Sequence, residues 1–278
     1  MTALLLLLGL IIGSFLSVVF SRLEIDEHAS GRKSVKNARK TVREATFGRS
    51  RCDHCHKQIA WYDNIPLVSY IWLRGECRHC GKHISAYHPV LELSTALLFG
   101  AAYLTYGLSA QLAIMLFFGA ALLLIFAYDL KHQIIPDVIV IPAIAFALAT
   151  ISLQFAFQMS GSSTEILLTA STATPYALGG LFFGGFFLAL YVLSKGTWIG
   201  GGDIKLGLLL GLLVGWPLVL VNLVLAYLIG TLYAVVMLVS RRASLKTYLP
   251  FGPMLVMAFF ITAYYGEQIA NWYETWFL

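Results

Sequence analysis

One carboxylate of this sequence, Asp203, stands between glycines and a lysine, in the hexapeptide from Gly200 to Lys205. The segment 206–216 that follows is apolar apart from its glycines. An ionisable group at the edge of such a segment is costly unless it faces protein or water, which favours a functional site. Gly200 and Gly202 let the backbone approach the carboxylate closely. The alternative is a flexible loop with an ordinary acid at a helix start, which the helix dipole also favours.

Two further acids, Asp129 and Asp137, flank another apolar-to-polar boundary. Asp129 follows the apolar run 120–128, so we expect it at the same membrane depth as Asp203 but on a different helix. Two close carboxylates share a proton, as in an aspartyl protease, where one activates water and the other donates a hydrogen bond to the scissile carbonyl. The alternative for Asp129 is a charge at a helix end beside Lys131. Asp137, next to Pro136, is typical of a turn residue or helix cap.

Four cysteines form two paired motifs separated by twenty-one residues: Cys52, Cys55, Cys77 and Cys80. This spacing is close to that of a zinc ribbon and predicts a closed structural Zn²⁺ site without an open catalytic position. A cytosolic location argues against disulfides. With four cysteines available, we expect the neighbouring histidines at the surface rather than as ligands (His54, His56, His79 and His83). No base-reading element accompanies the cysteines, so no nucleic acid is expected as a partner.

The composition is that of a membrane protein, with 59% hydrophobic and 12% charged residues and a mean hydropathy of +0.77. Residues 22–89 hold thirteen of the nineteen Lys and Arg and seven of the fourteen Asp and Glu, a net charge of +6. The other 210 residues carry a net charge of −1. The high isoelectric point therefore belongs to one polar segment, whose basic residues suit anionic membrane lipid.

The elements that must position these residues are apolar helices. The run 1–20 is long enough to span a bilayer and lacks the features of a cleaved signal peptide, so it predicts a retained helix in residues 1–21. Within 22–89 we expect a mobile arm, 24–51, and then a small core of Trp61, Tyr62, Tyr70 and Trp72 around the metal. Further helices are predicted at 90–106, 110–128, 138–157, 174–194, 200–216, 217–239 and 250–266, the one after Asp203 being short and glycine-rich.

The fold class is therefore an all-α polytopic membrane protein of about eight transmembrane helices, with a cytosolic zinc-ribbon-like segment between helices 1 and 2. We expect three parts: the first helix in 1–21, the basic tetracysteine segment in 22–89, and a transmembrane domain in 90–278. With eight spans, all nineteen Lys and Arg fall on the cytoplasmic side and both termini lie outside. Seven spans would break this agreement.

Motifs along most of the chain share their order and spacing with one family. They are Gly13-Ser14-Phe15-Leu16, Arg51-Cys52 through Cys55, Asp63-Asn64-Ile65-Pro66-Leu67, Arg74 through Gly81, Ile84-Ser85, Pro89 to Leu93, Asp129 with Ile135-Pro136-Asp137, Gly200 to Lys205, and Phe251-Gly252-Pro253. The chain resembles the bacterial type IV prepilin peptidases, which are bifunctional leader peptidases and N-methyltransferases of the membrane aspartyl protease class.

The resemblance implies that Asp129 and Asp203 are the catalytic aspartates and that Gly200, Gly202 and Lys205 belong to the active-site loop. It implies type IV prepilins or pseudopilins as substrates, cleaved at the cytoplasmic face of the inner membrane, and S-adenosylmethionine as the methyl donor. No nucleotide motif places that cofactor in the sequence. Residues 52–89 offer polar groups for it, and the faces of Trp61, Tyr62 and Trp72 suit either a cation or the membrane interface.

The departures from the family pattern spare the aspartates and cysteines. They are Ser17, Glu24, Asp53, His56 and the run 86–88, and they bear on the methyltransferase assignment alone. Two other classes stay open from the residues. One is a transporter or channel with an aspartate relay and a zinc-bearing regulatory segment, which an inverted repeat would favour. The other is a zinc-dependent membrane enzyme, which would need an open metal position.

Overall fold

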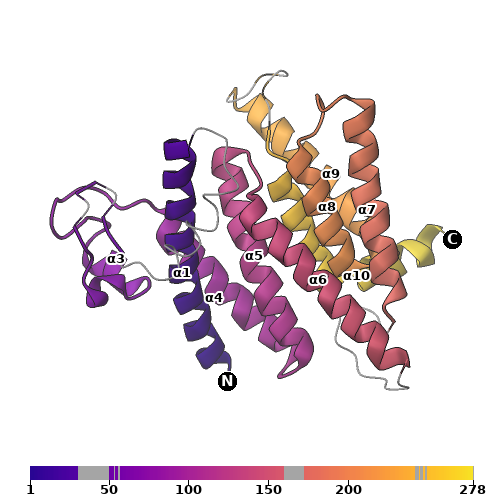
Figure 1. Cartoon of the computed structure of the whole chain (residues 1–278), viewed down its shortest axis with the longest axis horizontal. Helices are drawn as coiled ribbons and strands as arrows, with labels where there is room; N and C mark the ends of the chain where they lie inside the picture. Colours follow the sequence, from indigo (N-terminus) through magenta and orange to yellow (C-terminus); the bar gives the residue numbers. More distant parts are fainter. Residues whose placement is uncertain are drawn as a thin grey trace. The chain divides into compact units, whose positions relative to one another are not determined.

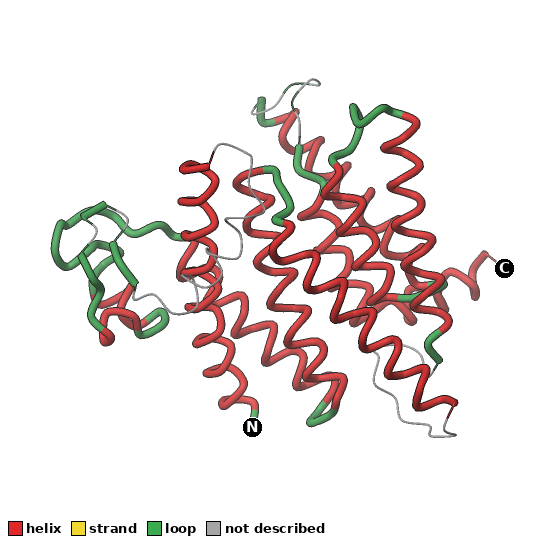
Figure 2. Tube along the Cα trace, viewed as in Figure 1, coloured by secondary structure: helices red, strands yellow, loops and turns green. Residues whose placement is uncertain are grey.

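The computed structural model is all-helical over the residues that it describes. These are 1–30, 50–52, 54, 55, 57–159, 172–241, 244, 247 and 249–277, without the side chains of 24–30, 158, 276 and 277. The helices are α1 (Thr2–Ser30), η1 (Trp61–Asn64), α3 (Val68–Trp72), α4 (Tyr87–Tyr106), α5 (Ala110–His132), α6 (Asp137–Met159), α7 (Thr174–Leu193), α8 (Gly201–Val214), α9 (Leu218–Val239) and α10 (Gly252–Phe277) (Figures 1 and 2). The predicted fold class is confirmed.

Each of the eight apolar segments predicted as helical contains a helix, but several ends were misplaced. α5 continues four residues beyond the predicted end at 128, because Gln133, in the left-handed conformation, is what ends it. α10 continues to Phe277, past the predicted end at 266. α1 runs into charged residues up to Ser30, so the start of the predicted mobile arm is helical. Charged residues are good helix formers, so the end of an apolar run does not by itself end a helix.

Five of these helices are long and apolar enough to cross a membrane, so the predicted count of eight spans is not confirmed. They are α1 (as Thr2–Leu23), α5, α6 (as Asp137–Phe157), α7 and α9. α8 has fourteen residues, a length of about 21 Å, which is shorter than the hydrocarbon core of about 30 Å. The prediction that this segment is short and glycine-rich is confirmed.

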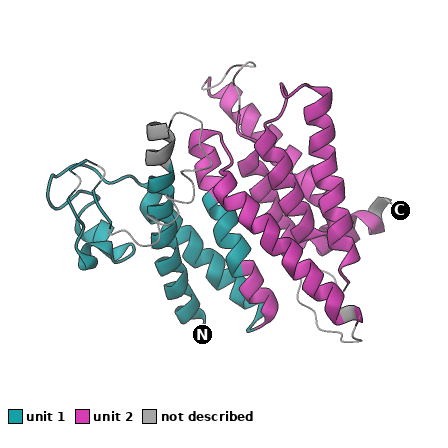
Figure 3. Cartoon of the chain, viewed as in Figure 1, with its two compact units in different colours: residues 1–108, 116–124 teal, residues 109–115, 125–278 magenta. Residues whose placement is uncertain are grey.

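The chain forms two compact units, coloured teal and magenta in Figure 3: residues 1–108 with 116–124, and residues 109–115 with 125–278. In the first unit, α1 packs along α4. A Cβ on Gly9 would lie 2.6 Å from the Cα of Ala96, and one on Gly13 would lie 2.6 Å from the Cα of Glu92. The two backbones therefore touch at a small-xxx-small pair, a recurrent solution for helices packed in lipid.

In the second unit, α8 is the central helix, and it contacts α6, α7, α9 and α10. Nearly all of its side chains from Leu206 onward are buried. α7 reaches it through glycines: a Cβ on Gly179 would lie 2.5 Å from the carbonyl oxygen of Gly211, and one on Gly184 would lie 3.1 Å from Leu208. A helix that is apolar on all sides is stable only when other helices surround it. This packing fixes the first turn of α8, which carries Asp203.

Candidate active site and metal site

Asp129 and Asp203 come from different helices of the second unit and are both buried, with 4% and 5% of their surfaces exposed. Asp129 lies in the last turn of α5, and Asp203 lies in the first turn of α8. The two carboxylates interact electrostatically with one another. The convergence expected from the sequence is therefore present in the fold. Two acids brought together out of water are an arrangement that a shared proton stabilises.

Each carboxylate of this pair also accepts a hydrogen bond from a backbone amide at a helix start. The N–H of Gly200, the residue before α8, donates to Oδ2 of Asp203 at 3.1 Å. The N–H of Gly252, the first residue of α10, donates to Asp129. Amides at a helix start lack partners within the helix, so each acid satisfies one of them and is oriented by it. The pair is thus held by main-chain groups of α8 and α10.

Gly252 has a steric role beside this hydrogen bond. A Cβ at that position would collide with Oδ2 of Asp129 and would lie 3.5 Å from Cδ1 of Ile135. No larger residue fits there without moving the carboxylate. Gly252 belongs to one of the family motifs, but its role could not be predicted from the sequence, since the steric requirement comes from a residue more than a hundred positions away.

The connector between α5 and α6, Ile135-Pro136-Asp137, reaches both helix starts. Ile135 is buried, and its side chain lies against Gly202, where a Cβ would be 3.0 Å from it. Two residues further on, Oδ1 of Asp137 accepts a hydrogen bond of 2.6 Å from Nζ of Lys205. Asp137 is the first residue of α6, as its predicted role at a helix start requires. The connector thereby fixes the first turn of α8, including Asp203, from one side.

The predicted loop residues thus divide by their contacts. Gly200 contacts Asp203 directly, whereas Gly202 accommodates Ile135. Lys205 is paired with Asp137 instead of with either residue of the carboxylate pair. Its charge is therefore neutralised outside the pair.

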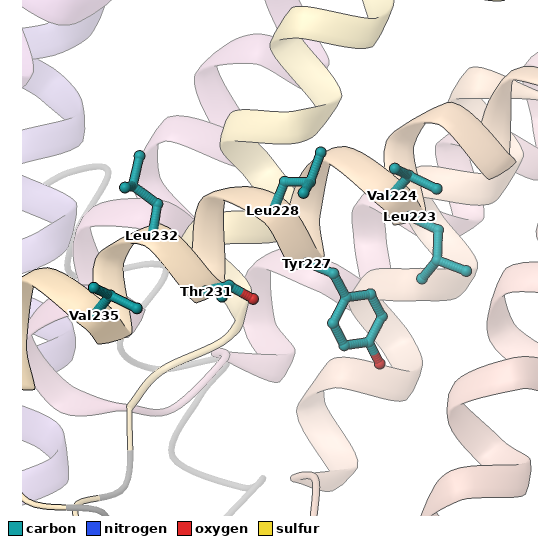
Figure 4. A pocket seen from close by; sticks show the side chains of 7 residues that line it. All are labelled: Leu223, Val224, Tyr227, Leu228, Thr231, Leu232 and Val235. Atoms are coloured by element: carbon teal, nitrogen blue, oxygen red, sulfur yellow. The ribbon is translucent and has the colours of Figure 1, made fainter. Parts of the chain in front are cut away.

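A groove of about 570 Å³ lies elsewhere, along α9 (Figure 4). Its lining is apolar apart from Tyr227 and Thr231, and it contains no carboxylate, histidine or cysteine. The ring of Tyr227 packs against that of Phe251, with centroids 5.2 Å apart. An apolar concavity on a helix long enough to span a membrane suits lipid chains, so we do not place the chemistry there. The groove is lined by Leu223, Val224, Tyr227, Leu228, Thr231, Leu232 and Val235.

The four cysteines converge in the first unit, where their sulfur atoms all lie within 4.8 Å of one another. The first cysteine of each pair makes the same backbone hydrogen bond. The N–H of Cys52 donates to the carbonyl of Lys57 at 3.0 Å, and the N–H of Cys77 donates to the carbonyl of Lys82 at 2.9 Å. A backbone N–H at His79 donates to the Cys77 sulfur and lowers its pKa to about 7. Four cysteine sulfurs so close to one another can bind a metal ion.

The histidines near the cysteines behave as expected where the structure describes them. Nδ1 of His83 is hydrogen-bonded to the carbonyl oxygen of Gly75 at 2.7 Å, so this nitrogen is not directed at the cysteine cluster. His54 and His79 are exposed, and His56 lies outside the described residues. Cysteines alone make up the cluster among the residues described.

The predicted aromatic core around the metal is wrong. Trp61 and Trp72 are 82% and 79% exposed, Tyr62 is also exposed, and only Tyr70 is partly covered. Neither η1 nor α3 has a buried residue. The segment is held instead by backbone turns and by an ion pair in which Arg78 donates three hydrogen bonds to Oδ1 and Oδ2 of Asp63. So few residues cannot enclose large rings and also close a metal site.

Sequence analysis also missed Glu92, a buried acid of α4 with 7% of its surface exposed. Its Oε2 accepts a hydrogen bond of 2.8 Å from the N–H of Leu67, and Ser14 of α1 also hydrogen-bonds to its side chain. Three family motifs of the first unit therefore meet at one carboxylate. Its position inside an apolar helix was the available signal.

These features define a polytopic membrane protein with two buried aspartates and a separate tetracysteine cluster. Two family models match the chain: the Bacterial Peptidase A24 N-terminal domain over residues 7–106 and the Type IV leader peptidase family over residues 116–235. The chain belongs to the type IV leader peptidase family.

Curated relatives cover almost the whole chain. The prepilin leader peptidase/N-methyltransferase of Pseudomonas aeruginosa is 33% identical over 96% of this chain and 91% of the relative. A protein of the same name from Aeromonas hydrophila is 33% identical over 99% of this chain and 94% of the relative. Another, from Dickeya chrysanthemi, is 36% identical over 91% of this chain and 89% of the relative. No solved structure matches the chain.

Proposed function

We propose that this protein is a membrane aspartyl endopeptidase that removes the leader peptide of type IV prepilins or pseudopilins and then N-methylates the new N-terminal residue. The observation that carries the peptidase is the burial of Asp129 and Asp203 at two helix ends, within electrostatic reach of one another and each hydrogen-bonded by a backbone amide. Because the chain belongs to the type IV leader peptidase family, we do not retain the two alternative classes, a transporter or channel and a zinc-dependent membrane enzyme.

In this mechanism the two acids share one proton. The ionised carboxylate takes a proton from a water molecule, and the resulting hydroxide attacks the scissile carbonyl carbon. The protonated carboxyl donates a hydrogen bond to the carbonyl oxygen and stabilises the tetrahedral intermediate. Transfer of a proton to the leaving nitrogen then breaks the C–N bond and releases two peptides. We assign these roles to Asp129 and Asp203 jointly, because the surroundings of the two carboxylates do not distinguish base from acid.

The site suits a substrate that is itself embedded in the membrane. Asp129 lies in the last turn of a helix long enough to span the bilayer, so the bond to be cut lies at the membrane face. We assign this face to the cytoplasmic side of the inner membrane, with both termini outside and residues 22–89 inside. Positive charge on the cytoplasmic side supports that orientation. The basic residues of 22–89 then face anionic lipid, and no nucleic acid is required.

The cysteines would hold a structural Zn²⁺ through Cys52, Cys55, Cys77 and Cys80. The spacing of the sulfur atoms supports this, since Sγ of Cys52 and Sγ of Cys80 are 3.9 Å apart. Neighbouring ligands of a tetrahedral zinc with bonds of about 2.3 Å are separated by about 3.8 Å. Four thiolates leave no open position, so the ion would supply folding energy and take no part in peptide hydrolysis.

We place methyl transfer with S-adenosylmethionine in residues 52–89, apart from the carboxylate pair. Hydrolysis needs no cofactor, and this segment has more polar groups than the apolar helices of 90–278. Trp61 and Trp72 are exposed, so their rings are accessible to a ligand or to the membrane, whereas the guanidinium of Arg78 lies over the ring of Tyr62. The division of the chain into helix 1–21, segment 22–89 and peptidase domain 90–278 follows from this assignment.

The test is to incubate the purified full-length protein in lipid nanodiscs with a prepilin, with and without labelled S-adenosylmethionine. We expect leader removal in both samples and label at the new N-terminus in one. The matched control is Asp129→Asn protein, which should leave the prepilin intact. An intact prepilin with the unsubstituted, folded protein would refute the proposed peptidase.

A further inference from the structure

An exposed apolar surface lies on η1 and α3 of the first unit. Its members are Trp61, Tyr62, Ile65, Val68, Ile71 and Trp72. Ile71 and Trp72 are 74% and 79% exposed, and with Val68 they occupy one face of α3 at the spacing i, i+3, i+4. Six large apolar side chains open to solvent within twelve residues are unexpected in a segment this rich in charge.

The depth of this surface along the membrane helices can be derived from two contacts. Tyr87, the first residue of α4, stacks on Phe20, the last residue of the apolar run of α1, with ring centroids 5.6 Å apart. Glu92 lies five residues further along α4, about 7.5 Å deeper. Its carboxylate accepts the N–H of Leu67 at 2.8 Å. Leu67, between Ile65 and Val68, is therefore held below the end of the apolar run of α1.

The polar backbone groups around Leu67 have hydrogen-bond partners within the protein, as burial in a membrane requires. Leu67 has φ 56°, a conformation that costs energy for any residue with a side chain, and Glu92 accepts its N–H. The N–H of Ser69 donates to Ile65 at 3.1 Å, and the N–H of Ile71 donates to Leu67 at 3.0 Å. Pro66 has no N–H to satisfy. Irregular backbone is tolerated at membrane depth only when its polar groups have partners within the protein.

We propose that η1 and α3 form an interfacial element that lies in the lipid headgroup region, with its six apolar side chains covered by lipid and Glu92 setting its depth. Trp and Tyr are the residues most enriched at this level of a bilayer. Residues 50–86 carry five basic and three acidic residues, a net charge of +2, so anionic lipid is favoured. The segment is consequently cytosolic only in part, since one of its faces touches the membrane.

The position of this interfacial element also bears on methyl transfer, and that consequence rests on the proposed function. A bond cut at the membrane face leaves its new N-terminus at that depth. A methyl-transfer segment anchored in the headgroup region is likewise held at a membrane face. The membrane contact itself does not depend on the enzyme's activity and is tested separately.

The experiment places photoreactive benzoylphenylalanine at Ile71 and, as a matched control, at Lys82, an exposed residue of the same segment. The full-length protein is irradiated in vesicles of phosphatidylcholine and phosphatidylglycerol and analysed by mass spectrometry. We expect at least about tenfold more lipid adduct at position 71 than at position 82. Equal adduct at the two positions, or a crosslink from position 71 to a second copy or to an added prepilin, would overturn the proposal.

A second variant tests how the depth is set. Glu92→Ala should lower the adduct at position 71 severalfold, because the Leu67 amide loses its partner and the turn is released. Metal content serves as the folding control, since the cysteine cluster does not include Glu92. An unchanged adduct in Glu92→Ala protein that retains its metal would remove Glu92 from the proposal. Cleavage of a prepilin by unsubstituted protein is scored in the same samples, so failure of the interfacial element and failure of the peptidase remain distinguishable.

Discussion

The carboxylate pair and the cysteine cluster are organised by different forces. Asp129 and Asp203 are buried among helices whose backbones touch through glycines, and main-chain amides hold both acids. The cysteines lie in an open segment that has no aromatic core and is shaped by turns, one ion pair and a hydrogen bond to Glu92. The first site depends on packing, and the second depends on the metal that we propose for it. Substitutions should therefore damage the two activities through different causes.

Substitution of the aspartates is expected to separate the two activities, leader cleavage and methyl transfer, most strongly. Asp129→Asn and Asp203→Asn should each lower leader cleavage by about a thousandfold or more, because an amide neither activates water nor shares a proton. Methyl transfer to a pilin that has already been cleaved should persist. The measurement compares cleavage of a prepilin with label transfer from S-adenosylmethionine, and Glu267→Gln, at an exposed acid of α10, is the control. Full cleavage by Asp203→Asn, or loss of both activities in a folded variant, would contradict two separate sites.

Gly252→Ala should lower cleavage by about a hundredfold, since its methyl group would displace Oδ2 of Asp129 and misplacement by about 1 Å is costly in an active site. Gly201→Ala is a matched control at the start of another helix. A Cβ on Gly201 meets nothing within 4 Å, so this variant should cleave as well as unsubstituted protein. Equal rates for the two variants, measured on one prepilin, would show that the Asp129 position is not sterically set.

Removal of the metal should show the opposite pattern. Elemental analysis is expected to find one zinc per chain, and the double variant Cys52→Ser, Cys55→Ser should lose it, because two thiolates cannot close the site. Methyl transfer should fall by more than about tenfold, while cleavage should change by less than about threefold. Zinc-free protein with residues 50–86 still resistant to proteolysis would show that the metal does not hold this segment.

The smallest effect is expected at the ion pair between Asp137 and Lys205. Both side chains are partly exposed, and such a pair contributes about 1 kcal/mol at most. Asp137→Asn should therefore lower kcat for cleavage by about fivefold, with KM unchanged, because the pair steadies α8 without touching substrate. The exchange Asp137→Lys, Lys205→Asp should restore most of the loss. A change in KM alone would indicate contact with the leader peptide instead.

Much of this molecule could be predicted from local patterns. The all-helical class, the clustering of the four cysteines and the convergence of the two acids follow from hydropathy, from spacing and from the side of the membrane that Lys and Arg prefer. Each of these signals lies in neighbouring residues or in a period along one helix. The ends of α1, α5 and α10 were missed because charged residues continue a helix as readily as apolar ones.

What only the tertiary structure decided are contacts between residues far apart in the chain. Gly252 must be a glycine because Asp129 occupies the space of its side chain, and Ile135 reaches Gly202 across the same site. Glu92 is buried where its carboxylate accepts a hydrogen bond from the backbone N–H of Leu67. The exposure of Trp61 and Trp72 was likewise mispredicted, since a cluster of aromatic residues has the same sequence pattern in a protein core and at a membrane interface. Sequence patterns give each residue's preference for water or lipid, whereas the identity of its neighbour depends on how the helices pack.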